Sequence, residues 1–219
     1  MRLAVFDCDG TLVDSQINIV RAMDDSFARH KLTPPSPKET RRVVGLSLVE
    51  AMQQLLPEAD AALHQSLAED YKQAFHRLRA GGQLEAEPLY PGVREGLAEL
   101  EARGWLLGVA TGKSDRGLKL CLEHHGLHPH FITLQTADRH PSKPHPAMLH
   151  AAMRDAGTEA LRTVMIGDTS FDMAMAQAAG CHALGVDWGY HDNAELQAAG
   201  AHHIVEDMPS LLAQLEQCA

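Results

Sequence analysis

The fold is decided by the stretch Arg2-Leu3-Ala4-Val5-Phe6-Asp7-Cys8-Asp9-Gly10-Thr11-Leu12-Val13-Asp14-Ser15. Its first part, Leu3 to Phe6, has the length and composition of a buried strand. Because side chains alternate between the two faces of a strand, we expect Asp7 and Asp9 to point the same way and Cys8 the other way. Two carboxylates held close together repel unless a cation or a proton joins them. An ordinary Asp-Gly turn explains Asp-x-Asp alone, but the full string after an apolar strand predicts an acidic functional site, with Gly10 allowing a sharp turn or a close approach to a ligand.

Composition places the chain among ordinary soluble globular proteins. Of its 219 residues, 45% are hydrophobic and 22% are charged, which is enough to bury a sizeable core. The net charge of -10 argues against sequence-independent binding to nucleic acid, because such binding requires a basic surface. An anionic substrate would need a local cation. No apolar stretch is long enough to span a bilayer, so we expect no membrane partner.

The cysteines and the first residues of the chain indicate the cellular compartment in which the protein works. The cysteines at positions 8, 121, 181 and 218 form no C-x-x-C pair. They are typical of reduced thiols in a cytosolic protein rather than of a disulfide framework or a zinc site. The chain enters its first strand at once, without a signal-peptide pattern. We therefore predict a cytoplasmic protein, either a monomer or a homodimer.

Residues 16–87 have a helical pattern with no clear strand. Apolar residues recur on one helical face from Ile17 to Ala28, and a second stripe at spacings of three and four runs from Leu63 to Leu78. Prolines break the chain between these helices, Gly81-Gly82 ends the second one, and Pro91-Gly92 marks the exit from the segment. The pattern predicts an all-helical domain over residues 16–87, inserted after the first strand.

Beyond residue 92 strands and helices alternate. Strand-like runs occur at 105–110, 131–134, 163–167, 182–186 and 202–205. Such alternation predicts a parallel sheet covered on both faces by helices. The predicted α/β core is discontinuous and consists of residues 1–15 and 88–219. In sheets of this kind ligands bind at the carboxyl ends of the strands, near the switch in strand order.

Polar residues follow the next three predicted strands as well. Thr111-Gly112-Lys113-Ser114 offers a hydroxyl, a flexible amide and a helix start to a phosphate, although a simple N-cap is the more economical explanation of Ser114. Lys143 follows the third strand between two prolines that restrain its backbone, although a loop lysine is usually just solvated. Asp168 and Asp172 follow the fourth strand on one face of a helix start, where the helix dipole favours carboxylates. Capping alone would also account for Asp168.

Taken in order, the strand ends carry Asp-x-Asp, Thr, Lys and Asp-x-x-x-Asp. This order resembles the four motifs of the haloacid dehalogenase-like phosphatases, across the whole core, and implies a Rossmann-like sheet. The helical insert resembles the four-helix cap of one type in that superfamily, and the start of the chain, the cap size and Val43-Val44-Gly45 resemble the phosphoglycolate phosphatase-like enzymes. Two features depart from the common pattern. Gly112 stands where asparagine is frequent, and Pro141-Ser142 precede Lys143 where glycine is frequent.

The resemblance assigns a role to each motif. Asp7 would attack phosphorus, and Asp9 would act as general acid and base, oriented by Gly10 and Thr11. Mg²⁺ would be held by oxygen ligands, with Asp172 binding one of its waters or orienting Lys143. The expected metal ligands are Asp7, the Asp9 backbone carbonyl, Asp168 and Asp172. The residues expected to hold the phosphate are Gly10, Thr111, Gly112 and Lys143.

The implied activity is Mg²⁺-dependent hydrolysis of a small phosphorylated metabolite through an aspartyl-phosphate. A phosphomutase of the same fold, like β-phosphoglucomutase, is the close alternative, and it would have to keep a bisphosphate intermediate bound. A dehalogenase is disfavoured because halide leaves without a proton, so Asp9 would be superfluous. From another class, a phospho-acceptor signalling domain also groups aspartates, threonine and lysine on a parallel sheet, but such domains are shorter and lack the helical insert.

Specificity requires contacts that the phosphate motifs do not make. The insert is the only large element left to face the leaving group, and the candidate stretch in it is Arg41-Arg42-Val43-Val44-Gly45-Leu46-Ser47. Gly45 could bring the backbone close to the substrate. Arg41 or Arg42 could pair with a second anionic group, although both could equally be solvated surface charges.

Overall fold

Strand β1 (Arg2–Phe6) lies inside a six-stranded parallel sheet. The structure is a computed structural model and describes residues 1–218. The strand order is β3-β2-β1-β4-β5-β6, which is the Rossmann-like arrangement, so the predicted fold class is confirmed. The other strands are β2 (Trp105–Thr111), β3 (Thr133–Thr136), β4 (Thr163–Gly167), β5 (His182–Val186) and β6 (His203–Val205). The order reverses between β1 and β4, which opens a crevice at their carboxyl ends.

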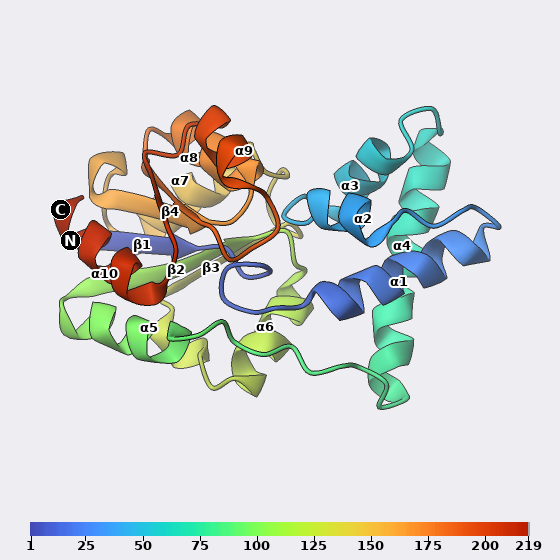
Figure 1. The fold of residues 1–219 in the computed structure, drawn as a ribbon, viewed down its shortest axis with the longest axis horizontal. Coiled ribbons are helices and arrows are strands. Elements are labelled where there is room, and N and C mark those ends of the chain that lie inside the picture. Colours follow the sequence, from blue (N-terminus) through green and yellow to red (C-terminus); the bar gives the residue numbers. More distant parts are fainter. Residues whose placement is uncertain (219) are drawn as a thin grey trace.

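Helices cover both faces of the sheet, as the alternating pattern predicted (Figure 1). Alternation along β1 sends Ala4 and Phe6 into one hydrophobic cluster and Leu3 and Val5 into another. The first cluster is closed by α5 (Val93–Ala102), α6 (Asp115–His124) and α10 (Met208–Gln217). The second is closed by α7 (Ala147–Ala156), α8 (Ser170–Ala179) and α9 (Asn193–Ala198).

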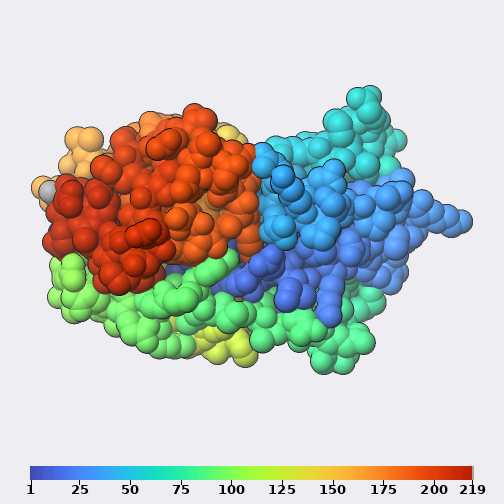
Figure 2. Space-filling model, viewed as in Figure 1, coloured from blue at the N-terminus to red at the C-terminus, as the bar shows by residue number. Residues whose placement is uncertain are grey.

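The segment between β1 and α5 folds into helices beside the carboxyl edge of the sheet (Figure 1). These helices are α1 (Gln16–Arg29), α2 (Pro37–Arg42), α3 (Leu48–Leu55) and α4 (Ala61–Ala80). They have a hydrophobic cluster of their own around Met23, Phe27, Met52 and Leu67. Figure 2 shows the insert, in blue to cyan, gathered at one end of the molecule against the core. A smaller cluster of Val43, Leu46 and Ala51 packs against Phe171 of α8 and joins the two parts.

Two local features differ from what the sequence pattern indicated. Strand β3 begins at Thr133 rather than at Phe131, because a 3-10 turn over His128–His130 precedes it and Phe131 turns into the core. Cys8 and Cys121 are 113 positions apart in sequence, yet their sulfur atoms lie 3.9 Å from each other in the buried core.

Among residues 1–218, the structure contains no helix with both the length and the apolar character needed to cross a membrane.

Candidate active site

Three buried carboxylates meet at the carboxyl ends of β1 and β4. Asp7 follows β1, Asp168 follows β4, and Asp172 lies in the first turn of α8. The two strands are direct neighbours, with Phe6 opposite Ile166, so they deliver Asp7 and Asp168 to the same place. One oxygen of each carboxylate lies within 4.8 Å of the others. The structure thus brings together three residues that the sequence pattern singled out at separate strand ends.

Lys143 is buried in the same cluster, with 1% of its surface exposed. Its Nζ lies 2.9 Å from Asp7 Oδ1 and 2.6 Å from Asp172 Oδ1. Burial alone would lower the pKa of this ammonium, but Asp172 and Asp7 raise it above its ordinary value, so Lys143 is charged. An ammonium has three N–H donors. Two serve these carboxylates, which leaves the third for a ligand.

The cluster carries more negative than positive charge. Three carboxylates against one ammonium leave two negative charges uncompensated when all of them are ionised. Burial, with a further contribution from Asp172, raises the pKa of Asp7 to about 7 although Lys143 opposes the shift. Burial and the charges of Asp7 and Asp172 also raise the pKa of Asp168. A divalent cation would remove the imbalance, and carboxylate oxygens are ligands that Mg²⁺ prefers. The donor set therefore fits a divalent metal ion.

The two oxygens of Asp7 have different surroundings. Oδ1 accepts a hydrogen bond from the backbone N–H of Cys8 at 2.7 Å and also faces Lys143. Oδ2 has no hydrogen-bond partner among residues 1–218. By contrast, both oxygens of Asp168 are engaged, one by the Thr11 hydroxyl at 2.7 Å and the other by the Tyr190 N–H at 2.9 Å. Asp7 is therefore held in place by one oxygen while the other is available.

Asp9 is held by Ser15 and Lys113, and the expected roles of Gly10 and Thr11 need correction. The Ser15 hydroxyl donates to Asp9 Oδ1, and Lys113 Nζ lies 2.8 Å from the same oxygen. The Gly10 N–H donates to the Val13 carbonyl at 2.9 Å, so it is not a free donor for phosphate or for Asp9. Thr11 reaches Asp168 instead, because the tight turn after Asp9 directs its hydroxyl toward β4.

Close packing explains two glycines of the motifs. Gly10 has a φ of +87°, and a Cβ there would collide with the Asp168 carboxylate. Gly112 has no room for a side chain either, because a Cβ would lie 2.5 Å from the carbonyl oxygen of Leu46 in the insert. The glycine that stands where asparagine is frequent is therefore required by the contact between the core and the insert.

A cavity of about 940 Å³ lies between the core and the insert, with Asp7 and Asp9 in its wall. The residues that line it on the core side, close to these carboxylates, include Thr111, Gly112 and Lys113. Lys143, Asp168 and Asp172 are 1% exposed or less and are not among the residues that line the cavity. The functional groups through which the core could react with a ligand in the cavity are therefore gathered around Asp7 and Asp9.

The structure corrects the expected specificity residues in the insert. Arg42 forms an ion pair with Glu195 of α9 on the outer surface, and Arg41 donates a hydrogen bond to the Gln16 side chain at 3.2 Å. Neither lines the cavity, because α2 turns these side chains toward the core surface and toward α1. Gly45 does line it, in a left-handed conformation with φ +98°.

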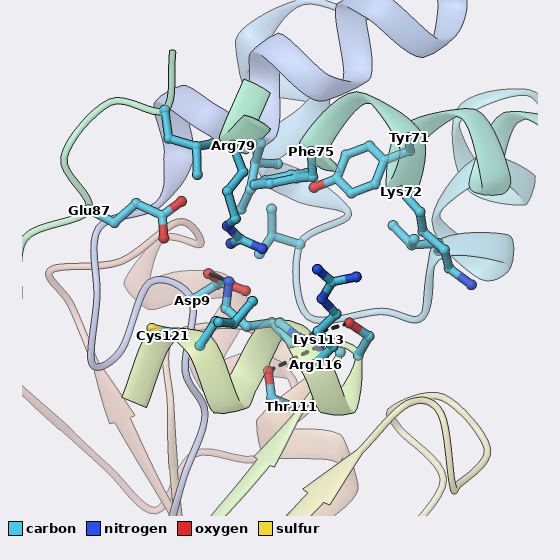
Figure 3. Close-up of a pocket in the computed structure, with 18 of the residues that line it drawn as sticks. Asp9, Tyr71, Lys72, Phe75, Arg79, Glu87, Thr111, Lys113, Arg116 and Cys121 are labelled. Atoms are coloured by element: carbon cyan, nitrogen blue, oxygen red, sulfur yellow. Dashed lines mark hydrogen bonds and ion pairs between the residues drawn. The ribbon is translucent and has the colours of Figure 1, made fainter. Parts of the chain in front are cut away.

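Sequence reasoning missed several residues that line or shape the cavity. Lys113 directly follows Thr111-Gly112, and Ser15 closes the opening stretch, so both lie inside stretches that the sequence pattern singled out, although no role was assigned to them. On the insert, Tyr71, Phe75 and Arg79 recur every four positions along α4 and all line the cavity (Figure 3). That spacing places them on one helical face, and this periodicity was the signal that could have found Arg79.

Comparison with known proteins identifies the family. The model of the haloacid dehalogenase-like hydrolase family matches residues 4–186, and the chain belongs to this family. The probable phosphatase IndB of Dickeya dadantii is 38% identical over 208 residues, which cover 93% of this chain and 89% of that protein. A phosphoglycolate phosphatase of Photobacterium profundum is 29% identical, covering 97% and 94% of the two chains. The crystal structure of a predicted phosphatase from Clostridium acetobutylicum superposes with a TM-score of 0.89 at 25% identity, covering 99% and 98%.

These relatives confirm the predicted superfamily and its phosphoglycolate phosphatase-like subgroup. They also confirm that the chain is a phosphatase, as the order of the strand-end motifs implied.

Proposed function

We propose that this phosphatase hydrolyses a small phosphate monoester through an aspartyl-phosphate on Asp7, with Mg²⁺ as its cofactor. The observation that carries the proposal is the arrangement of Asp7, whose Oδ1 is held by Cys8 and Lys143 while Oδ2 has no partner within residues 1–218. Asp7 also lines the cavity. A carboxylate can serve as a nucleophile of this kind when it is positioned in line with the phosphorus.

The metal would be held by Asp7, Asp168 and Asp172 and by the backbone carbonyl of Asp9. The two uncompensated charges of the buried cluster support a divalent ion. When bound, Mg²⁺ would neutralise negative charge on the phosphoryl group and among these carboxylates. Asp172 already accepts from Lys143 and, through its other oxygen, from Thr169, which supports a role in orienting Lys143.

Residues of the chain itself would carry the remaining chemistry. The free N–H of Lys143 and the hydroxyl of Thr111 would hold phosphoryl oxygens during transfer. Asp9, kept in position by Ser15 and Lys113, would protonate the leaving oxygen and then take a proton from the water that cleaves the intermediate.

Residues 16–87 would act as a cap on a core formed by residues 1–15 and 88–219. The insert has its own hydrophobic cluster, and residues of its 43–46 segment line the cavity opposite the core. A cap in this position would exclude bulk water from the reacting groups.

Replacement of Asp7 by Asn tests the proposal. We expect Asp7→Asn to lose at least about 99% of the phosphate release from p-nitrophenyl phosphate in Mg²⁺, because loss of a nucleophile has cost factors near 10⁶ elsewhere. Asp187→Asn, an exposed carboxylate outside the site, is the matched control. Substantial turnover by Asp7→Asn, or full wild-type activity in excess chelator, would contradict the mechanism. Isomerisation of a sugar phosphate without release of phosphate would instead indicate a phosphomutase.

A further inference from the structure

The cavity continues far beyond the carboxylates that would handle the phosphate. Its volume is about 940 Å³, and its wall includes one face of α4, the segment that follows α4, and the start of α6. Figure 3 shows Asp9 and Lys113 on one side and Tyr71, Phe75 and Arg79 facing them across the open space. Cavities of this size hold ligands with many more atoms than a two-carbon ester has.

Two arginines enter this space from opposite sides without a partner. Arg79 comes from the last turn of α4 and Arg116 from the first turn of α6, and both guanidinium groups point into the cavity in Figure 3. Within residues 1–218, neither guanidinium forms a hydrogen bond or an ion pair with another side chain or with the backbone. Both residues are exposed, so they are free to meet a ligand.

The acidic residues in the same wall are already engaged. Glu85 pairs with Arg21 at 2.9 Å, and Glu123 lies 3.8 Å from Lys119. The Glu87 carboxylate accepts a hydrogen bond from the Asn18 side chain at 2.8 Å. Glu87 keeps its negative charge, because its partner is a neutral amide. Arg79 and Arg116 outnumber this one carboxylate, although the chain as a whole has a net charge of -10.

An aromatic wall lies next to the arginines. Tyr71 and Phe75 are one turn apart on α4, with ring centroids 5.3 Å from each other. Both line the cavity, and Leu120 of α6 lines it as well. Aromatic faces favour contact with another ring or with a guanidinium group, so this wall suits a ring-bearing leaving group.

We propose that Arg79 and Arg116 form an anion subsite for the leaving group, and that the substrate is a phosphate monoester of a ring-bearing alcohol or phenol with a second anionic group. The inference rests on the proposed phosphatase activity and adds the substrate class. A guanidinium pairs well with a carboxylate through parallel hydrogen bonds. A two-carbon leaving group such as that of phosphoglycolate would leave the aromatic wall uncovered.

Three esters test the substrate class with wild-type protein. Phenyl phosphate supplies the ring alone, 4-carboxyphenyl phosphate supplies the ring and the anion, and phosphoglycolate supplies the anion without a ring. We expect kcat/KM, measured by phosphate release in Mg²⁺, to be about tenfold or more higher for 4-carboxyphenyl phosphate than for either of the others, as a charge-assisted contact would give. A preference for phosphoglycolate would overturn the inference.

Variants test the assignment to these two arginines. We expect Arg79→Gln and Arg116→Gln each to lower the kcat/KM ratio of 4-carboxyphenyl to phenyl phosphate by about tenfold, and the double variant to abolish the preference. Arg77→Gln is the control, because Arg77 lies on the same helix but pairs with Asp25 outside the cavity. Phe75→Ala should lower kcat/KM for both aryl esters relative to phosphoglycolate.

The outcomes separate the two proposals. If the wild type hydrolyses the aryl esters in an Asp7-dependent way but the ratio is unchanged in the double variant, the subsite is wrong and the phosphatase mechanism stands. If the protein releases phosphate from none of the esters, or if Asp7→Asn remains active, the proposed function fails and the subsite inference falls with it. A ratio that drops equally in Arg77→Gln would also overturn the assignment, because the effect would then not depend on the cavity.

Discussion

Asp7 combines two properties that oppose each other, since it is fully buried and would have to act as an anion. Burial favours the protonated form and raises its pKa from 3.8 to about 7, while Lys143 favours the ionised form. A metal ion among the three carboxylates would shift the balance further toward the anion. Without a metal, the folded protein bears an electrostatic cost at this residue above neutral pH.

That cost predicts a pH-dependent stability in the metal-free protein. Between the unfolded pKa near 3.8 and the folded value of about 7, the folded state holds the Asp7 proton more tightly. The free energy of unfolding that this group contributes is therefore fully present below about pH 4 and is lost as the pH rises through about 7. In excess chelator, Asp7→Asn should be more stable than wild type at about pH 8 and similar to it at about pH 4. Urea denaturation at the two pH values measures this, and a less stable variant at the higher pH would refute it.

We predict that Lys113 contributes to binding of the substrate phosphate. Its Nζ lies 2.8 Å from Asp9 Oδ1, so it offsets one of the two carboxylates that an incoming phosphate dianion meets. Lys113→Met should lower kcat/KM for p-nitrophenyl phosphate by roughly tenfold to a hundredfold, as expected for the loss of a hydrogen bond between charged groups. Lys113→Arg should restore part of it. Lys119→Met serves as the control, because Lys119 lies six positions further on and is exposed on α6. Wild-type rates in Lys113→Met would count against the role.

The sequence allowed us to predict which residues meet at the site, because parallel strands place their carboxyl ends at the same edge of the sheet. Asp7, Thr111, Lys143 and Asp168 each follow a recognisable apolar run, so topology alone places them close together. The partners of Asp9 were not predictable, because they depend on the path of the turn after Gly10, where the N–H of Gly10 bonds to Val13 and Thr11 is directed to Asp168.

Among the elements, the region around the end of α2 connects the insert to α8 and α9 of the core by two contacts. Phe171 packs against the cluster of Val43, Leu46 and Ala51, and Arg42 pairs with Glu195 at the surface. An exposed ion pair contributes about 0–1 kcal/mol, whereas removal of a half-buried aromatic ring costs more, roughly 1–3 kcal/mol. The apolar contact should therefore dominate the docking of the insert.

Truncation of one side chain from each contact tests which of the two contributes more to stability. Phe171→Ala should reduce the free energy of unfolding by about 1–3 kcal/mol and increase amide exchange over residues 43–47. Arg42→Ala should change the free energy of unfolding by less than about 1 kcal/mol. Urea denaturation and hydrogen exchange provide the two readouts. A larger loss of unfolding free energy in Arg42→Ala than in Phe171→Ala would show that the ion pair, not the apolar contact, dominates the docking of the insert.

The bounds of helices and strands were predictable where apolar residues recur with a clear period. They were less predictable where a short apolar run is compatible with two strand registers. The stripe from Leu63 to Leu78 predicted α4 closely, because one face is buried over several turns. Strand β3 was displaced by two residues, because Phe131 is apolar in either setting and only pairing of Thr133 with Gly108 fixes the register. The insertion angle of α2, which carries Arg41 and Arg42 away from the cavity, has no local signal in the sequence.

At the scale of the whole molecule, charge is distributed unevenly. The chain has a net charge of -10, yet an anionic substrate is expected at a site whose wall carries Asp7 and Asp9. Lys113, Arg79 and Arg116 place positive charge around the cavity, and Lys143 lies beneath it. Field lines from such a local arrangement favour an anion in the cavity even when the remaining surface repels it.

If the buried carboxylates bind Mg²⁺ as proposed, metal binding and the stability of the entire fold are linked. A ligand that binds only the folded state stabilises it by RT ln(1 + [L]/Kd), which is about 2.7 kcal/mol at a hundredfold excess over Kd. For a chain of this size, that corresponds to a rise in Tm of roughly 5–10 °C. We expect Mg²⁺ to raise the Tm of wild type at about pH 8, where Asp7 and Asp168 would otherwise be costly to ionise.

The response should depend on the cluster and not on surface acidity. Asp168→Asn removes one proposed ligand and should lose most of the Mg²⁺-induced rise in Tm, while Asp187→Asn, which is exposed outside the cluster, should keep it. Differential scanning calorimetry over a Mg²⁺ titration gives the shift without any measurement of activity. An equal rise in Asp168→Asn and wild type would mean that Mg²⁺ acts elsewhere on the acidic surface, and the three carboxylates would then need another source of charge balance.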